Sequence, residues 1–393
     1  MTDLLEIAPP HCQYFEAGVC RSCTFIETPI AGQLATKQER CASLLPQVPS
    51  HAWLPAAYGG VTGFRNRAKL AAGGAAGSVT LGILDGDREG VDLTECLIHE
   101  DAIRTAIPRV AEVLNDSRIE PYSVPKRTGE LKYVHITVNS DAELMVRFVV
   151  RTEHGLGIIR RQLGALREAL PNAVAISVNL LPEHKAVLEG EHEEPLFGDD
   201  LPMRLGAGSQ AITLHLRPQS FFQTNTRVAL ALYEQASNWV GRVDPASLWD
   251  LYCGVGGFAL FTANTGDGEA RDVLGVEVSE QAIRSAERSA RDANIPARFI
   301  AADATAFALA ADRSELPELV IVNPPRRGIG AELADWIEAS PIHHVIYSSC
   351  NPESLARDLE RMPSLNVREA RLFDMFPHTG HLEVAVLLER AAA

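Results

Sequence analysis

After residue 245 the sequence alternates short apolar runs with helix-forming segments, and this alternation constrains the fold more than any other feature. The runs predicted to be strands are 247–252, 273–278, 298–301, 319–322 and 344–347. Repeated strand–helix–strand units form a parallel sheet that helices cover on both faces. Ligands of such sheets bind beyond the carboxyl ends of the strands. We therefore expect an α/β fold with a ligand site at that edge.

A glycine-rich loop, 253–258, follows the first of these strands, and Glu277 lies near the end of the second. A carboxylate about 20 residues beyond such a loop can accept both hydroxyls of an adenosine ribose. No Lys or Ser/Thr that would grip a pyrophosphate follows the loop. A nucleoside without a pyrophosphate fits best, and S-adenosylmethionine is such a ligand. The alternative is a tight turn that binds nothing.

The segment Asn323-Pro324-Pro325-Arg326-Arg327-Gly328 follows the fourth strand. Its two prolines stiffen the loop and remove two backbone donors. The amide of Asn323 then becomes a fixed hydrogen-bonding group at the ligand edge. A structural turn would explain the prolines, but not the two arginines beside the expected site.

Cys350 stands at the tip of the fifth strand, beside a helix that is predicted to begin at Pro352. The unsatisfied N–H groups of a helix N-terminus favour a thiolate. This position predicts a thiol that is exposed and acidified. The alternative is a buried cysteine that serves as a small apolar residue.

Five motifs occur in one order along the chain: Gln219-Ser220-Phe221-Phe222-Gln223-Thr224-Asn225, 250–258, 323–328, Ser348-Ser349-Cys350-Asn351-Pro352 and His381-Leu382-Glu383-Val384. Together they resemble the RNA uracil-C5 methyltransferases, and the resemblance covers nearly the whole chain. It implies a C-terminal Rossmann-like, class I S-adenosylmethionine-dependent domain that makes 5-methyluridine. It also implies a nucleophile, Cys350, a base, Glu383, and contacts to S-adenosylmethionine from Gln223, Tyr252, Glu277 and Asn323, which Asp303 is expected to join.

This chemistry needs both catalytic groups because uracil C5 is a poor nucleophile. A thiolate that adds to C6 turns the ring into an enolate, whose C5 can take the methyl group. A base must then remove the C5 proton so that the cysteine leaves. The target nucleotide must also be flipped out of its stack or presented from a loop. Phe221, Phe222 and Phe376 are candidates for its pocket, and each is equally well explained as core.

Four of the seven cysteines form a second group near the N-terminus, in the pattern Cys12-x7-Cys20-x2-Cys23 with Cys96 much later. Four thiolates suit either zinc or an iron–sulfur cluster, and their spacing alone does not decide. The pattern resembles the members of the same family that bear a 4Fe-4S cluster. That resemblance implies that the ligands of a 4Fe-4S cluster are Cys12, Cys20, Cys23 and Cys96.

The composition suggests a cytoplasmic monomer that does not contact membranes. The N-terminus is acidic and lacks a signal-peptide pattern, and no apolar run approaches the roughly 20 residues of a membrane helix. The net charge of −15 argues against non-specific coating of nucleic acid. Local basic surface remains available, and the segments 63–69 and 126–133 are the candidates for RNA contact. Residues 130–190 carry strand patterns around an intervening helix.

The predicted organisation has three parts: an iron–sulfur region (1–100), a central α/β lobe that contacts RNA (101–205) and a methyltransferase domain (206–393). Some members of the family carry an N-terminal β-barrel before the cluster, and this chain begins almost at its first cluster cysteine. That combination resembles the members that modify 23S ribosomal RNA during rRNA processing. Asn323 agrees, because other branches usually have Asp there.

Three alternatives remain from the sequence. The enzyme could methylate transfer RNA or another ribosomal position. It could belong to a different class, the iron–sulfur enzymes that use S-adenosylmethionine as a radical source, in which case Cys350 would have no task. A catalytically inert RNA-binding protein is the third alternative, and the presence of both Cys350 and Glu383 argues against it.

Overall fold

The computed structural model describes residues 7–208, 211–263 and 271–391. Contacts divide the chain into two compact units: unit 1 holds the described residues of 1–9, 25–59 and 204–393, and unit 2 holds residues 10–24 and 60–203. The sequence was divided into three parts by their expected roles, at residues 1–100, 101–205 and 206–393, and that division stays a prediction. By contacts alone, the segment 25–59 groups with the C-terminal half.

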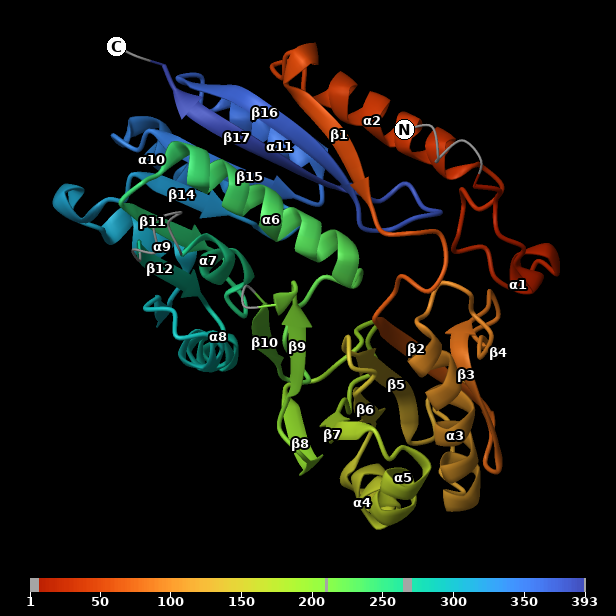
Figure 1. Cartoon of the computed structure of the whole chain (residues 1–393). Coiled ribbons are helices and arrows are strands. Elements are labelled where there is room, and N and C mark those ends of the chain that lie inside the picture. The colour runs from red at the N-terminus through yellow and green to blue at the C-terminus, as the bar shows by residue number, and fades with distance from the viewer. Residues whose placement is uncertain (1–6, 209–210, 264–270, 392–393) are drawn as a thin grey trace. The chain divides into compact units, whose positions relative to one another are not determined.

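Unit 1 is built on an eight-stranded sheet in the order β1-β16-β17-β15-β14-β11-β12-β13 (Figure 1). Its strands are β1 (Trp53–Tyr58), β11 (Ser247–Leu251), β12 (Asp272–Glu277), β13 (Arg298–Ala301), β14 (Leu319–Val322), β15 (His344–Ser349), β16 (Leu365–Asp374) and β17 (Glu383–Arg390). The five predicted strands are confirmed as β11 to β15, and they pair in parallel. The sheet is nevertheless mixed, because β17 runs antiparallel between β15 and β16.

Helices cover both faces of this sheet, as the alternating pattern predicted. They are α2 (Ile30–Leu44), α6 (Thr226–Val243), α7 (Gly257–Thr262), α8 (Glu280–Asp292), α9 (Ala304–Ala310), α10 (Gly330–Ala339) and α11 (Pro352–Glu360), with 3-10 turns η2 (Ser50–Ala52) and η4 (Arg313–Glu315). The chain steps outward from β11 to β13 and returns to β14 on the other side of β11. Because parallel crossovers are right-handed, this reversal places α7 and α8 on one face and α10 and α11 on the other. The Rossmann-like fold expected from the sequence is therefore confirmed.

Unit 2 is built on a seven-stranded sheet in the order β4-β3-β2-β5-β6-β7-β8. Its strands are β2 (Arg67–Ala75), β3 (Ser78–Leu84), β4 (Gly90–Asp92), β5 (Leu131–Val138), β6 (Leu144–Val150), β7 (Ala173–Leu180) and β8 (His192–Phe197), and its helices are α1 (Gln13–Glu16), α3 (Asp101–Ser117), α4 (Glu153–Arg161) and α5 (Leu163–Ala169). Two further strands, β9 (Leu201–Leu205) and β10 (Ile212–Leu216), form a small separate sheet.

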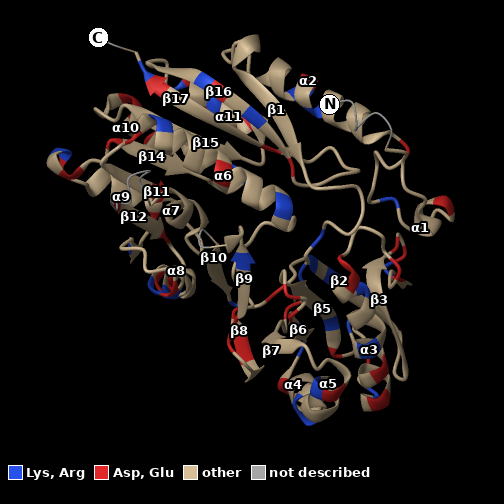
Figure 2. Cartoon of the chain, viewed as in Figure 1, with Lys and Arg blue, Asp and Glu red and all other residues tan. Residues whose placement is uncertain are grey.

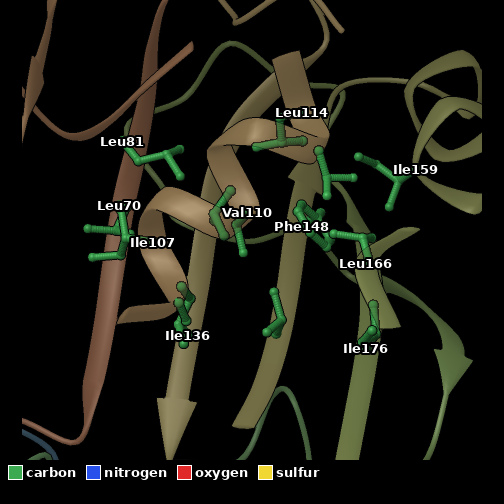
Figure 3. Packing of buried hydrophobic residues seen from close by; sticks show 14 of the residues in the cluster. Leu70, Leu81, Ile107, Val110, Leu114, Ile136, Phe148, Ile159, Leu166 and Ile176 are labelled. Atoms are coloured by element: carbon green, nitrogen blue, oxygen red, sulfur yellow. The ribbon is translucent and has the colours of Figure 1, made fainter. Parts of the chain in front are cut away.

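One face of the unit 2 sheet forms an apolar core with its helices. Figure 3 shows Ile107, Val110 and Leu114 of α3 packed with Ile136 and Phe148 of the strands, all of them fully buried or nearly so. Burying a side chain of this size stabilises a fold by about 1.5–3 kcal/mol relative to leaving it in water. Successive residues of a strand point to opposite faces. The face away from the helices is therefore free to carry polar side chains.

Candidate active site

The ligand edge of unit 1 is the carboxyl end of its sheet, where the strand order reverses between β11 and β14. Tyr252 follows β11, Glu277 ends β12 and Asn323 follows β14. Doubly wound sheets bind their ligands at such a switch point. The fold thus brings three of the four predicted S-adenosylmethionine contacts to the edge where a ligand is expected.

The glycine loop after β11 is shaped by residues in the left-handed backbone region. Gly254 and Gly256 have φ values of +53° and +87°, and Tyr252 adopts +68° although it has a side chain. Such a conformation is uncommon outside glycine. At Gly257 the reason for glycine is space, because a Cβ there would lie 2.5 Å from the ring of Tyr233. The loop therefore lets α7 begin close against α6.

Glu277 is held rigidly at the end of β12. Its Oε2 accepts a hydrogen bond from the backbone N–H of Gly254 at 3.3 Å, and its Oε1 accepts one from Ser279 at 3.0 Å. Ser279 caps α8 by accepting a hydrogen bond from the backbone N–H of Ala282. A carboxylate has about four lone-pair sites, so two backbone bonds leave capacity for ligand hydroxyls.

The fourth predicted contact, Gln223, and the additional candidate, Asp303, each have a local structural position. Gln223 is buried two residues before Asn225, whose side chain caps α6. Asp303 caps α9 by accepting the N–H of Ala306 at 2.9 Å. One oxygen of Asp303 is thereby committed to the fold.

Cys350 follows β15 and precedes Asn351, which caps α11, and the predicted helix start at Pro352 is confirmed. The prediction of an exposed, acidified thiol is wrong for this structure, because Cys350 is half-buried and its pKa is raised. Burial is the main cause, and the carboxyl group of Glu383 adds to it. Arg326 acts in the opposite direction through its charge and a hydrogen bond to the thiol. Desolvation therefore outweighs the helix terminus and the guanidinium.

Glu383 is the first residue of β17 and is only 2% exposed. Burial raises its pKa to about 7, and a hydrogen bond from Ser348 works against that shift. The Ser348 hydroxyl donates to Glu383 Oε1 at 2.5 Å, and Asn323 Nδ2 donates to Ser348 Oγ at 3.5 Å. A carboxyl group with a pKa near neutrality is suited to general-base catalysis.

The register of β15 and β17 brings the two predicted catalytic residues together. Ser349 pairs with Val384 across the antiparallel ladder. The next residues outward, Cys350 and Glu383, therefore lie opposite one another although 33 positions separate them in the sequence. Their mutual effect is visible in the pKa of Cys350, which the charge of Glu383 raises.

An N-terminal helix that the sequence did not connect with this site braces the segment leading to Glu383. The Lys37 ammonium of α2 donates to Asp374 at 2.6 Å and to the Phe376 carbonyl at 3.1 Å, and both ionisable side chains are buried. The Gln33 side chain accepts from the N–H of His378 at 2.7 Å. Nothing in the sequence marks Lys37 as buried, so sequence reasoning missed this contact.

The three candidate pocket aromatics differ in their surroundings. Phe222 is buried at 3% exposure and belongs to the core, whereas Phe221 is 72% exposed. Phe376 is half-buried and its ring meets that of His381 edge-on. A large aromatic ring held in water beside a buried neighbour is available for stacking, so Phe221 is the strongest of the three candidates.

The four N-terminal cysteines all belong to unit 2 and are half-buried. Burial raises the pKa of Cys23 to about 12, with further contributions from the nearby thiols of Cys96, Cys20 and Cys12. Arg65 lies close enough to lower it. Tyr14 of α1 accepts the N–H of Glu95 at 3.0 Å and so ties the first cysteine segment to the last.

The thiols of Cys12, Cys20, Cys23 and Cys96 lie near one another, but they are not arranged around a single point. Across the described residues, no group of three or more His, Cys, Asp or Glu side chains is placed to hold a single metal ion. A four-iron cluster binds each thiolate to a different iron, so its ligands stand farther apart than those of one ion. The four thiols lie near one another and beside Arg65.

Comparison with known proteins gives consistent matches. Residues 196–391 match the family model described as tRNA (Uracil-5-)-methyltransferase. The 23S rRNA (uracil(747)-C(5))-methyltransferases of Halothiobacillus neapolitanus and Edwardsiella ictaluri are 45% and 41% identical to this chain. These alignments cover 97% and 98% of this chain and 99% and 100% of the relatives.

A solved structure is similar over most of the chain as well. The Pyrococcus abyssi tRNA (uracil-54, C5)-methyltransferase, in complex with S-adenosyl-L-homocysteine, is 27% identical with a TM-score of 0.75. The similarity covers 93% of this chain and 85% of that one. The order of the motifs, the Rossmann-like sheet and the full-length relatives agree, and this chain belongs to the family of RNA (uracil-C5)-methyltransferases.

Proposed function

We propose that this protein transfers a methyl group from S-adenosylmethionine to C5 of a uridine in 23S ribosomal RNA, at the position that corresponds to uridine 747. The observation that carries this proposal is the pairing of a thiol, Cys350, with a buried carboxyl group, Glu383, at the ligand edge of unit 1. The substrate is chosen from the relatives above 40% identity, which are named for that nucleotide. The tRNA enzyme of known structure is a more distant relative.

In the first half of the reaction the Cys350 thiolate attacks C6 of the uracil ring. A carbon–sulfur bond forms, and the electrons of the C5–C6 double bond move toward the C4 carbonyl oxygen. C5 of the resulting enolate then displaces the methyl group from the sulfonium, and S-adenosylhomocysteine leaves. Covalent catalysis of this kind divides one difficult step into easier ones.

In the second half the Glu383 carboxylate removes the proton from C5. The C5–H electrons restore the double bond, and the C6–sulfur bond breaks to release Cys350 as a thiolate. Glu383 must be ionised to accept this proton. Because its pKa is about 7, release of the product should speed up as the pH rises through neutrality.

S-adenosylmethionine supplies the methyl group when it is bound. We assign its ribose hydroxyls to the Glu277 carboxylate, and we place Tyr252, Asn323 and Gln223 around the remainder. Glu277, Tyr252 and Asn323 are assigned because they lie at the switch point of the sheet. Gln223 is assigned from the resemblance to the family. Phe221, which is exposed two residues before Gln223, is assigned to stack on the uracil base that is flipped out of the RNA.

Unit 2 is proposed to hold a 4Fe-4S cluster through Cys12, Cys20, Cys23 and Cys96. The support is a set of four neighbouring half-buried thiols, with the Arg65 guanidinium beside them to offset the negative charge of the cluster. Methyl transfer contains no redox step, so the cluster serves to stabilise unit 2. Zinc is the alternative occupant. Anaerobic purification should give a brown protein, whereas a colourless one with stoichiometric zinc would contradict this assignment.

The cellular setting follows from the substrate. No helix within the described segments is long and apolar enough to cross a membrane. An enzyme that modifies ribosomal RNA works where that RNA is found, which supports a cytoplasmic location. All of the proposed catalytic groups come from one chain, which supports action as a monomer.

The decisive experiment maps 5-methyluridine in the 23S rRNA of cells that lack this protein. Loss of the modification at the position of uridine 747, and its return with the wild-type gene but not with Cys350→Ala, is the expected result. Loss from transfer RNA instead would move the assignment to the tRNA enzymes. An unchanged pattern in both RNAs would refute methylation of uridine in either.

A further inference from the structure

Unit 2 contains a cavity of about 390 Å³ whose lining differs in charge from the rest of this acidic protein. Three basic residues line it, Arg88, Lys132 and Lys185, together with three ring side chains, Tyr122, Tyr133 and His184. None of its described lining residues is acidic. In a chain of net charge −15, a cavity with only cations and rings as its polar lining needs an explanation.

Hydrogen bonds hold the rings and one cation of this cavity in place. The Lys132 ammonium donates to the Glu183 carbonyl at 2.6 Å and lies 4.6 Å from the centre of the Tyr122 ring. The Tyr122 hydroxyl meets His184 Nδ1 at 2.8 Å. The loop that carries His184 and Lys185 is therefore fixed to the start of β5. A cavity that is formed in advance binds a ligand without the cost of ordering its own walls.

Acidic residues lie near this cavity but outside its lining, and one of them, Glu183, acts on Lys132 through its charge. Asp85 shares a turn with Arg88, but its carboxylate accepts the N–H groups of Asp87 and Glu89, both at 2.9 Å. Glu189 is paired with Arg147 on the sheet. Figure 2 shows basic residues along β2 and β5 and acidic residues along β8.

Cations beside flat rings suit a nucleotide, because phosphate binds Arg and Lys while a base stacks on an aromatic ring. We propose that this cavity binds one unstacked nucleotide of the RNA substrate, with its phosphate toward Arg88 and Lys185 and its base against Tyr133. The site is separate from the one at Cys350. This inference rests on the proposed function, since it takes the substrate to be RNA.

The test measures binding of an unmodified 23S rRNA transcript at several salt concentrations. The double variant Arg88→Glu, Lys185→Glu should weaken binding by about ten-fold or more. The slope of the logarithm of the binding constant against the logarithm of the salt concentration should fall in magnitude by about one to two, as expected for the loss of one or two phosphate contacts. Tyr133→Leu should weaken binding by about ten-fold without changing the salt slope. Arg161→Glu is the matched control, because Arg161 is exposed on α4 and lies outside the cavity lining.

Equal losses in the Arg161→Glu control and the cavity variants would overturn the proposal, as would unchanged affinity in all of them. Binding of free uridine monophosphate as tightly as the transcript would also overturn it, because the cavity would then serve a free nucleotide. Failure of the proposed function looks different: wild-type protein would bind the transcript through the cavity yet leave it unmethylated.

A separate observation in unit 1 concerns a chain of hydrogen bonds that ends at Glu383. The Ser348 hydroxyl is completely buried and has a single hydrogen to donate. Asn323 Nδ2 donates to Ser348 Oγ at 3.5 Å, so this oxygen acts as an acceptor on one side. Its hydrogen points to Glu383 Oε1 at 2.5 Å on the other side. By donating to Ser348 Oγ, the amide of Asn323 thus favours the orientation in which the Ser348 hydroxyl hydrogen points to the Glu383 carboxylate and stabilises it.

From this geometry we infer that Ser348 is a positioning residue for Glu383 and that Asn323 sets the direction of its hydroxyl. Oε1 is occupied by Ser348, which leaves Oε2 to take the proton from C5. An aspartate at position 323 would accept the same hydrogen and compete with Glu383 for it. The other titratable groups that interact with Glu383 are the Cys350 thiol and the Tyr233 hydroxyl, and both carry raised pKa values.

The test follows release of the RNA–protein adduct as a function of pH in single-turnover reactions. Ser348→Ala should move the midpoint of release upward by about one pH unit, because the carboxylate loses a hydrogen bond that favours its charged form. Asn323→Asp should move it in the same direction. Ser348→Thr keeps the hydroxyl and should restore the wild-type midpoint.

Ser349→Ala provides the matched control, because the hydroxyl of Ser349 donates to the Asn351 carbonyl at 3.0 Å rather than to Glu383. An unchanged midpoint in Ser348→Ala, or an equal shift in Ser349→Ala, would overturn this inference. If the wild type forms neither adduct nor product, the proposed function itself has failed.

Discussion

The protein contains two thiol sites whose neighbours differ in kind. Cys350 in unit 1 faces a carboxyl group and a guanidinium, and the nearest ionisable groups are thus of opposite sign. The thiols of Cys12, Cys20, Cys23 and Cys96 in unit 2 are neighbours of one another. A single thiol between a base and a cation can add to a substrate carbon as a thiolate and can later be released from it. A set of thiols that raise one another's pKa values needs a cation among them before they ionise together.

Neighbours, and not exposure, distinguish the thiol that we propose as a nucleophile from the four thiols that we propose as ligands. Cys350 and the four grouped cysteines are all half-buried, and burial is the main cause of the raised pKa in Cys350, Cys23 and Cys96. Both sites have an arginine nearby, Arg326 at Cys350 and Arg65 at the grouped thiols, and what distinguishes Cys350 is the carboxyl group of Glu383 opposite it in place of other thiols. The following predictions test whether the two sites can be disabled separately.

Cys350→Ala should lower methyl transfer by at least about a thousand-fold, because the covalent step has no other nucleophile. Binding of S-adenosylmethionine and the brown colour of unit 2 should remain. Incorporation of tritiated methyl groups into 23S rRNA measures the first effect. Cys41→Ala is the control, since that thiol is buried on α2 and lies outside the proposed cofactor and catalytic residues. Turnover by Cys350→Ala at the level of this control would remove Cys350 from the mechanism.

Glu383→Gln should reduce turnover by about 10²- to 10⁴-fold, the usual contribution of a general base. Methylation itself should still occur, because the thiol and the cofactor site are intact. The variant should therefore accumulate a methylated RNA–protein adduct that is visible as a slow band on a denaturing gel. Normal turnover without such a band would show that another group takes the C5 proton.

Cys96→Ser should disable the other site alone. We expect loss of the visible absorbance and a lower unfolding temperature, measured by circular dichroism under anaerobic conditions. Methyl transfer per folded molecule should stay within about ten-fold of wild type, since residues without shared partners act almost independently. A complete loss of transfer in a protein that is still folded would show that the two sites are coupled.

Much of the fold was predictable because the C-terminal half follows a strict local pattern. Strands β11 to β15 were recognisable as apolar runs, and Pro352 marked a helix start, because the preference for proline at the first helical position depends on neighbouring residues only. The antiparallel placement of β17 and the added β1 were not predicted. Their pairing joins segments far apart in the chain, and such pairing leaves no local signature.

The sequence predicted the residues of the candidate site, but it did not predict their electrostatics. Motif order led to Cys350 and Glu383, yet an acidified thiol was expected from the helix terminus alone. The pKa of Cys350 depends on burial by distant segments, which a single sequence does not display. The bond from Ser348 to Glu383 was missed for the same reason, because it needs the register of β15 and β17.

The smallest expected effect concerns the reactivity of Cys350 toward iodoacetamide. Arg326→Ala removes a charge and a hydrogen bond that lower the pKa of this thiol, so the pKa should rise further. At a fixed pH below that pKa the thiolate fraction falls, and alkylation should slow by about three- to ten-fold. Mass spectrometry of the Cys350 peptide gives the rate. Arg327→Ala is the matched control, because Arg327 acts on Tyr252 instead. Equal rates in the two variants would mean that burial alone sets the reactivity of Cys350, and the contrast with the four grouped thiols would then rest on Glu383.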